Sequence, residues 1–259
     1  MKNLLRYVGI FLLLIILCFA FLNYNNKIEN QIQKSKTDQW IEQKNGNYII
    51  DRIVAYSNVY IESNEDNQRP NWQISAKQFT DFAIYIKSNK AKKTDETNIK
   101  EISIENIKID EMPKIGIPTF NTIRLKDFGK LEISKEEISN GIIKFDVIKD
   151  SENIDENKLQ FKNNGEFPLT FQYVNNEIVK DIIISDISKP LIYDASILKR
   201  INVPVDSLKS KISFNIKIVN ELGEEYIAEI QTILPITEEI YNGSQTNQIE
   251  VDRKLQLII

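Results

Sequence analysis

KISFNIKIV, residues Lys211–Val219, is the stretch that most clearly decides the fold class. Apolar side chains occupy every second position, and polar side chains occupy most of the positions between them. Because successive side chains of a strand point to opposite faces, this alternation predicts a strand with one buried and one exposed face. The positions predicted to face outward are Ser213, Asn215 and Lys217, and those predicted to face the core are Ile212, Phe214, Ile216 and Ile218.

A second alternating stretch follows, Glu225–Ile233 (EYIAEIQTI), and Asn220–Gly223 between the two has the composition of a turn. Two alternating stretches joined by a short polar turn predict an antiparallel hairpin. The last residues, Leu255–Ile259, are mostly apolar. We expect them to dock within the same chain as a final strand, with addition to a partner's sheet as the alternative.

Further short alternating segments predict strands from Tyr48 onward. Within Ile99–Ile109 the apolar phase shifts between Ile104 and Ile107, so we expect a β-bulge near Glu105-Asn106. Many short strands without a long helical period predict an all-β protein built from antiparallel sandwiches. The remaining predicted strands are Ile49–Tyr60, Phe82–Lys87, Ile142–Ile148, Lys158–Lys162, Leu169–Val174 and Ile182–Asp186.

The polar, acidic run Lys149–Asn157 is the best internal boundary. It predicts two Ig-like β-sandwich domains, residues 48–150 and 151–259. One extended sandwich with strands exchanged across the boundary is the alternative. The polar residues 24–47 are interpreted as a tether and residues 1–23 as a membrane anchor.

An unbroken apolar stretch, Tyr7–Leu22, follows the basic residues Lys2 and Arg6. This predicts an uncleaved signal anchor that crosses the cell membrane once, with a cytoplasmic N-terminus and an extracytoplasmic remainder. A cleaved signal peptide and a lipoprotein modified at Cys18 are the alternatives. The side chains expected to contact lipid are Tyr7, Leu12, Leu13, Leu14, Ile15, Ile16, Leu17, Phe19, Phe21 and Leu22.

Composition excludes several classes of function. The chain contains no histidine, which removes Ser-His-Asp and Cys-His hydrolases and histidine-ligated zinc. Its one cysteine, Cys18, lies in the predicted membrane segment, so the remainder has no disulfide. Without Lys2 and Arg6 the net charge falls from -4 to -6, and no basic stripe is present, which argues against a nucleic-acid partner. The bias toward Ile, Asn and Lys is typical of low-GC bacteria.

Candidate chemical sites are weak. The acidic residues of Lys149–Asn157 could bind calcium, but the run lacks the spacing and the glycine of a calcium loop, so a solvated loop is the better interpretation. Carboxylate pairs could support glycoside hydrolysis, but none stands out. Ser207 and Lys209 do not have the S-x-x-K spacing. We therefore predict no catalytic residue, no metal site, no cofactor and no small-molecule substrate.

Two tryptophans, Trp40 in the tether and Trp72 after a loop, are the candidate interaction residues. For Trp72 core packing is the favoured interpretation, so Trp40 is the better candidate for an exposed aromatic residue. The sequence favours a non-enzymatic binding or assembly role at the bacterial cell surface, with another envelope or membrane protein as partner. A carbohydrate- or wall-binding module is the alternative, and it predicts an exposed row of aromatic residues on one sheet face. A carboxylate-based hydrolase is the third hypothesis.

Overall fold

The protein is described by a computed structural model, in which Asn47–Ile259 belong to one compact unit. The predicted signal anchor lies outside the described residues. In the part of the chain that is described, no helix has both the length and the apolar character needed to cross a membrane. The described residues are 47–64, 71–88, 94–131, 138–163, 165–186, 188–250 and 255–258.

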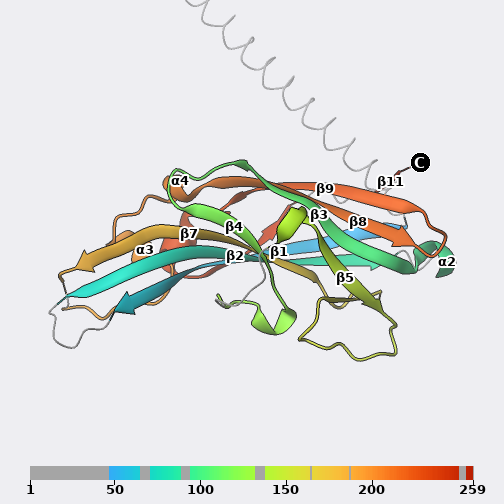
Figure 1. The fold of residues 1–259 in the computed structure, drawn as a ribbon, viewed down its shortest axis with the longest axis horizontal. Coiled ribbons are helices and arrows are strands. Elements are labelled where there is room, and N and C mark those ends of the chain that lie inside the picture. Colours follow the sequence, from blue (N-terminus) through green and yellow to red (C-terminus); the bar gives the residue numbers. More distant parts are fainter. Residues whose placement is uncertain are drawn as a thin grey trace, which may run out of the picture. The chain divides into compact units, whose positions relative to one another are not determined.

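One sheet has five strands in the order β10-β1-β2-β7-β4, and every neighbouring pair is antiparallel. Three of its strands are long and span most of the molecule in Figure 1. The bounds are β1 Tyr48–Asn64, β2 Trp72–Ser88, β4 Ile117–Thr122, β7 Leu169–Ile184 and β10 Gln245–Ile249.

The other sheet has six strands in the order β11-β9-β8-β3-β5-β6. Its neighbours are antiparallel except for β5 and β6, which are parallel. The strand bounds are β3 Ile99–Glu111, β5 Ile143–Ile148, β6 Gln160–Lys162, β8 Ser210–Asn220, β9 Glu225–Leu234 and β11 Gln256–Ile258. The described helices are short: α2 Thr94–Thr97, α3 Ile197–Arg200, α4 Val205–Leu208, and the 3-10 turns η1 Leu125–Asp127, η2 Ser139–Gly141 and η3 Glu238–Asn242.

The two sheets share an apolar core. Phe82 of β2 stacks on Phe171 of β7, with ring centroids 4.4 Å apart. Phe214 of β8 meets these rings edge-on, at 6.0 Å from Phe82 and 5.0 Å from Phe171. All three side chains are buried in one cluster with residues from both sheets. Because inward side chains of two facing sheets interdigitate here, the all-β, sandwich-like character expected from the sequence is confirmed.

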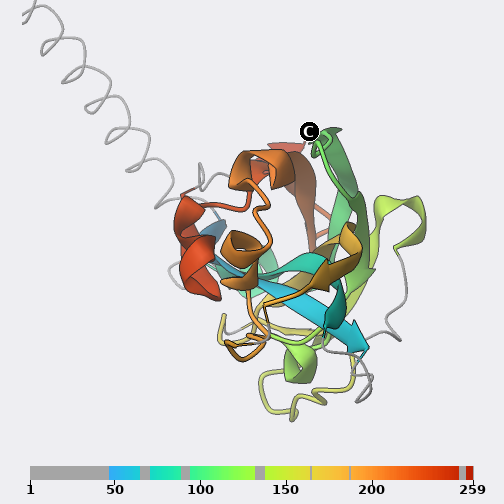
Figure 2. The ribbon, with the colours of Figure 1, turned by 90° about the vertical axis from the view of Figure 1, so that its left-hand side faces the viewer.

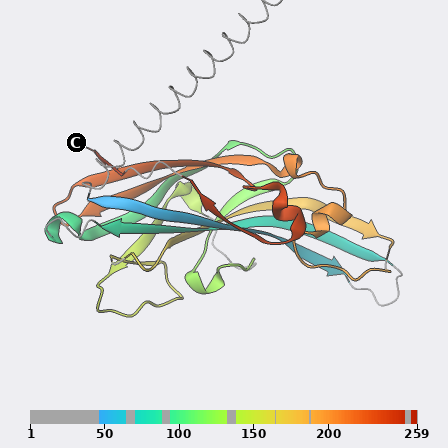
Figure 3. The same ribbon diagram turned by 180° about the vertical axis from the view of Figure 1, so that it is seen from behind.

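The halves of β1, β2 and β7 that lie away from this core, here called the far half, pack against other segments of the chain. Their inward side chains, such as Val59 and Ile74, belong to a second apolar cluster. Their partners there come from the segment around α3 and α4 and from η3, for example Leu198, Val205 and Ile240. Figure 2 shows these short helical elements at this end of the molecule, and Figure 3 shows the same segment from behind. Each long strand therefore contributes to two cores.

A row of buried polar side chains lies between the two clusters. Ser57 and Thr80 are hydrogen-bonded at 2.8 Å across β1 and β2. Gln78 is fully buried and pairs in register with Asn175 of β7. Both polar atoms of the Gln78 amide lack a hydrogen-bond partner among the described residues. A buried polar group without a partner costs free energy, so the Gln78 amide weakens the junction between the two cores.

Three local predictions are confirmed. β8 and β9 form the predicted hairpin, with Gly223 N donating to Asn220 O in the turn. β3 contains the predicted bulge: its register with β8 shifts after Glu105, and Asn106 has a φ of 53°. The C-terminal residues form β11, which pairs with β9 as the expected final strand.

The domain organisation follows the alternative of one sandwich with strands exchanged across the boundary. β2 pairs with β7, and β3 pairs with β8, so both sheets combine strands from before and after Lys149–Asn157. That run is a connection between β5 and β6 within the unit. Two separate Ig-like sandwiches, residues 48–150 and 151–259, would keep these pairings within each half. They are therefore not the arrangement found.

Candidate functional site

The outward face of the six-stranded sheet carries the candidate site, an open hollow of about 450 Å³ beside the β3 bulge. We call it the bulge hollow. β3, β8 and β9 supply its floor, and η2 supplies one wall. Its lining residues are Asn106, Ile107, Lys108, Asn140, Gly141, Ser213, Asn215 and Glu229.

The bulge and η2 fit together through two left-handed residues. Asn106 has a φ of 53°, and Asn140 of η2 has a φ of 65°. Left-handed backbone costs a residue with a Cβ atom roughly 1 kcal/mol, and asparagine tolerates it better than most. Gly141 is required next to Asn140, because a Cβ atom there would lie 3.2 Å from the Ile107 carbonyl oxygen and 3.3 Å from its nitrogen. The close approach of these two backbones forms the hollow.

The side chains of the bulge hollow are well supplied with unused hydrogen-bonding groups. Asn106, Asn140, Asn215 and Glu229 make no side-chain hydrogen bond with another residue in the described ranges. Asn215 lies opposite Glu229 in the β8–β9 register and opposite Glu105 in the β3–β8 register. Each carboxamide offers two donor hydrogens and an acceptor oxygen. The hollow can therefore donate to and accept from a polar ligand.

Charged groups beside the hollow are held in their ionised forms. The Ser213 hydroxyl, the Gln231 amide and the Lys108 ammonium lower the pKa of Asp110. Gln231 Nε2 lies 3.2 Å from Asp110 Oδ2, and Lys108 Nζ lies 3.5 Å from Asp110 Oδ1. Farther along β8, a hydrogen bond to Glu225 at 2.9 Å raises the pKa of Lys217. Neither Asp110 nor Lys217 is thus suited to exchange protons near neutral pH.

Two further hollows continue along the same face. The second hollow, of about 380 Å³, is lined by Glu105 among other residues. The third hollow, of about 360 Å³, shares the lining residues Lys100 and Val147 with the second. Ser103 in the second hollow donates to Glu105 Oε1 at 2.8 Å, so part of its polar surface is already paired. The bulge hollow has the larger volume and the larger share of unpaired side chains.

Trp72, predicted as a possible interaction residue, lies at the start of β2 in the far half of the molecule. It is half-buried and packs against the second apolar cluster. The Arg200 guanidinium lies 5.2 Å from its ring centroid and donates to the Pro190 carbonyl at 2.9 Å. Arg200 therefore connects the loop before α3 with Trp72, through a hydrogen bond to the loop and a cation–π contact with the ring. Trp40 lies outside the described residues.

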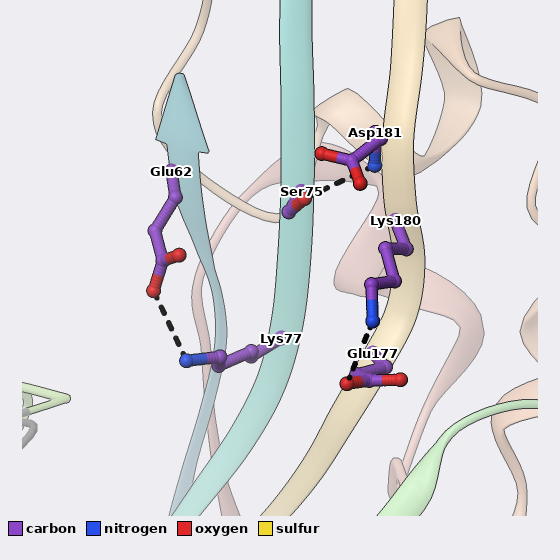
Figure 4. A network of polar contacts seen from close by, with 6 residues as sticks. All are labelled: Glu62, Ser75, Lys77, Glu177, Lys180 and Asp181. Carbon is purple, nitrogen blue, oxygen red and sulfur yellow. Dashed lines mark hydrogen bonds and ion pairs between the residues drawn. The ribbon is translucent and has the colours of Figure 1, made fainter. Parts of the chain in front are cut away.

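Figure 4 shows the outward face of the same far half, where exposed charges are paired. Glu62 lies 3.0 Å from Lys77 across β1 and β2, and Glu177 lies 3.4 Å from Lys180 within β7. Exposed pairs of this kind contribute about 0–1 kcal/mol each. Such pairs are typical of a solvated surface and do not indicate a catalytic or ligand-binding site.

β7 is also distorted in this region. Glu177 and Asp181 have φ values of 53° and 52°, and the register with β2 shifts twice between Asn175 and Ile182. The Asp181 amide donates to Ser75 Oγ at 3.1 Å, which returns β7 to its pairing with β2 after the second bulge. The distortion increases the twist of the far half.

The acidic run between β5 and β6 supplies no ligand cluster. Among the described residues, no group of three or more Asp, Glu, Cys or His side chains is placed to hold a metal ion. Asp155 Oδ1 instead accepts hydrogen bonds from the backbone amide of Asn157 at 3.0 Å and from the side-chain amide of Asn157 at 2.8 Å. These bonds lower the pKa of Asp155. Asp155 is thus paired within the run itself, as in a solvated loop.

Sequence reasoning missed the bulge hollow, although two of its signals were visible. Asn215 was identified as an outward position of β8, and the bulge was placed near Asn106. The position of η2 beside the bulge could not be inferred from the Asn140-Gly141 pair alone. Comparison of the chain with models of protein families, with curated proteins and with solved structures gives no match.

Proposed function

We propose that the protein is a bacterial envelope protein, held in the cell membrane by its N-terminal segment, whose all-β unit binds a component of the envelope without catalysing a reaction. The bulge hollow would be its binding site. The observation that carries a binding role is the strained backbone of that hollow. Asn106 and Asn140 both keep left-handed φ values there, and neither side chain makes a hydrogen bond with another described residue.

Membrane anchoring is supported by the sequence. Tyr7–Leu22 is an apolar stretch of near-spanning length with basic residues before it. The chain after it has no cysteine, so it needs no disulfide outside the cytoplasm. An anchor also keeps the binding unit close to other envelope components, which raises its effective concentration there.

The pKa shifts of the described side chains are compatible with binding without catalysis. A carboxyl group acting as a general acid needs a raised pKa. Where carboxyl pKa values are displaced in the described residues, the displacement is downward, as hydrogen bonds to Asp110, Asp186 and Asp206 illustrate. The groups with a raised pKa include tyrosines such as Tyr173, whose pKa burial raises to about 12. None of these shifts moves a pKa toward neutral pH, where a general acid or base works best.

The proposal is tested on the full chain in intact cells. A photo-crosslinking amino acid replaces Asn215 in the bulge hollow or, as a matched control, Leu222, which is 58 % exposed in the turn of the same hairpin. We expect a crosslinked envelope component from position 215 and none from position 222. External protease should also cleave the β unit in intact cells. Protection of the unit from protease, or identical crosslinks from both positions, would refute the proposal.

A further inference from the structure

We propose that the bulge hollow binds a sugar residue of an uncharged envelope glycan through hydrogen bonds alone. This inference rests on the proposed binding function and specifies its ligand class. This mode of binding differs from the stacking on a row of exposed aromatic rings that a carbohydrate-binding module predicts, because no aromatic residue is among the residues that line this hollow.

The size of the hollow suits a small polar ligand. Its volume of about 450 Å³ falls within the roughly 300–1,000 Å³ typical of small-molecule sites. It is open on the outward face of the sheet, so a ligand that is part of a longer polymer can enter without threading. The second hollow adjoins it at Glu105, which gives the polymer a path along β3.

The chemistry of the lining fits hydroxyl groups. A sugar hydroxyl both donates and accepts a hydrogen bond, and so does each carboxamide of Asn106, Asn140 and Asn215. Glu229 adds an acceptor, and Lys108 adds a donor. The lining holds one carboxylate, Glu229, and one ammonium, Lys108, which is already paired with Asp110, so it offers no unpaired positive charge for an anionic ligand. A neutral, polyhydroxylated ligand pairs with all of these groups.

An extended peptide fits this site less well. Peptides commonly gain affinity by adding a strand to a free sheet edge. The backbone of β8 beneath the hollow is already paired on both sides, with β3 through Asn215–Glu105 and with β9 through Asn215–Glu229. At Asn215, recognition therefore falls to the side chain. Side-chain amides can donate to and accept from the hydroxyl groups of a sugar.

The left-handed asparagines allow a variant that separates binding from folding. Glycine adopts φ values near 53° and 65° without strain, so Asn106→Gly with Asn140→Gly removes two carboxamides while the backbone is kept or stabilised. Asn202→Gly is the matched control. Asn202 also has a left-handed φ, 55°, but it is exposed after α3 and does not line the hollow.

The experiment uses the full chain in lipid nanodiscs and ligand-observed NMR. The probes are soluble tetrasaccharides of glucose, mannose and N-acetylglucosamine, and a hexapeptide of alternating Lys and Glu. We expect at least one tetrasaccharide to saturate the protein below about 10 mM. The Asn106→Gly, Asn140→Gly variant should lose about tenfold or more in affinity, because each lost hydrogen bond costs about 0.5–1.5 kcal/mol. The Asn202→Gly control should bind as the unmodified chain does.

Two results would overturn the inference. One is a failure of the saccharide probes, in which no tetrasaccharide binds at 10 mM or the peptide saturates the protein instead. The other is unchanged saccharide affinity in the double variant, which would place binding elsewhere. If saccharides fail while position 215 still crosslinks to an envelope protein, the ligand class is wrong and the proposed binding function stands. If both tests fail, the proposed function fails with it.

Discussion

The buried amide of Gln78 gives the sharpest test of how the fold is held together. This side chain is fully buried between the two apolar clusters, and neither of its polar atoms has a partner among the described residues. Methionine has a similar length and no hydrogen-bonding requirement. Gln78→Met is therefore expected to stabilise the protein, which is unusual for a substitution in a protein interior.

The magnitude follows from the cost of burying a polar group without a partner, about 1–3 kcal/mol in mutational data. The unfolded chain hydrates the Gln78 amide fully, so this cost falls on the folded state alone. Gln78→Met should raise the free energy of unfolding by about 1–3 kcal/mol. For a domain of this size, each kcal/mol corresponds to about 2–4 °C in Tm.

Gln172 of β7 is the matched control, since it is also fully buried. Its amide donates to Asp81 Oδ1 at 2.5 Å and to the Lys130 carbonyl at 3.2 Å. Gln172→Met should therefore destabilise the protein by about 1–3 kcal/mol, the opposite sign. Urea unfolding of the full chain in detergent, followed by circular dichroism, measures both changes. A loss of stability in Gln78→Met comparable to that in Gln172→Met would mean that the Gln78 amide is satisfied, and our account of the polar row would be wrong.

Two further predictions concern β7, and a third concerns β8 of the opposite sheet. Burial raises the pKa of Tyr173 to about 12 from its ordinary value near 10, so its contribution to stability is complete below pH 10 and is lost as the pH rises toward 12. In Tyr173→Phe, the urea midpoint should fall less steeply across that interval. Glu177→Gly should raise the free energy of unfolding by about 1 kcal/mol, and Tm with it, because glycine adopts a left-handed φ of 53° without strain. Glu177→Ala keeps a Cβ atom at this position and should give no such gain. Phe214→Ala should cost about 3–5 kcal/mol in urea unfolding, since its ring touches both Phe82 and Phe171 of the opposite sheet.

Local structure was predictable where the alternation of apolar side chains is regular. The β8–β9 hairpin follows from such alternation, and the bulge at Asn106 follows from a single shift in its phase. β7 was predicted as two strands, Leu169–Val174 and Ile182–Asp186, but it is one strand, Leu169–Ile184. The bulges with left-handed Glu177 and Asp181 interrupt the alternation without ending the strand, so the pattern could not show its continuity.

Two strands gave no usable pattern. β4 (IPTFNT) contains a proline and lies at a sheet edge, and β10 (QTNQI) is almost wholly polar. Both form because a neighbouring strand offers them hydrogen bonds, β7 in the first case and β1 in the second. Edge strands depend on such pairing more than on side-chain burial. Their sequences therefore carry little of the information that places them.

The domain boundary failed as a prediction for a related reason. A polar, acidic run such as Lys149–Asn157 is equally suited to a linker between domains and to a long loop within one. What decides between them is which strands pair, and β2 finds its partner in β7, about 90 residues later in the chain, as the Asp81–Gln172 pair shows. Pairing over such separations depends on how the inward side chains of many strands fit together. No single stretch contains that information.

The exchanged arrangement matters for the proposed function because it joins the entry of the chain to the bulge hollow. Asn47, at the start of the unit, donates to the Glu96 carbonyl at 3.1 Å and to the Tyr226 hydroxyl at 2.5 Å. Tyr226 lies in β9, which also supplies Glu229 to the hollow three residues later. The β8–β9 hairpin thus holds both the first residue of the unit and the floor of the site. An anchored chain of this kind would present its hollow at a fixed distance from Asn47, where the predicted tether ends, which a flexible pair of domains would not do.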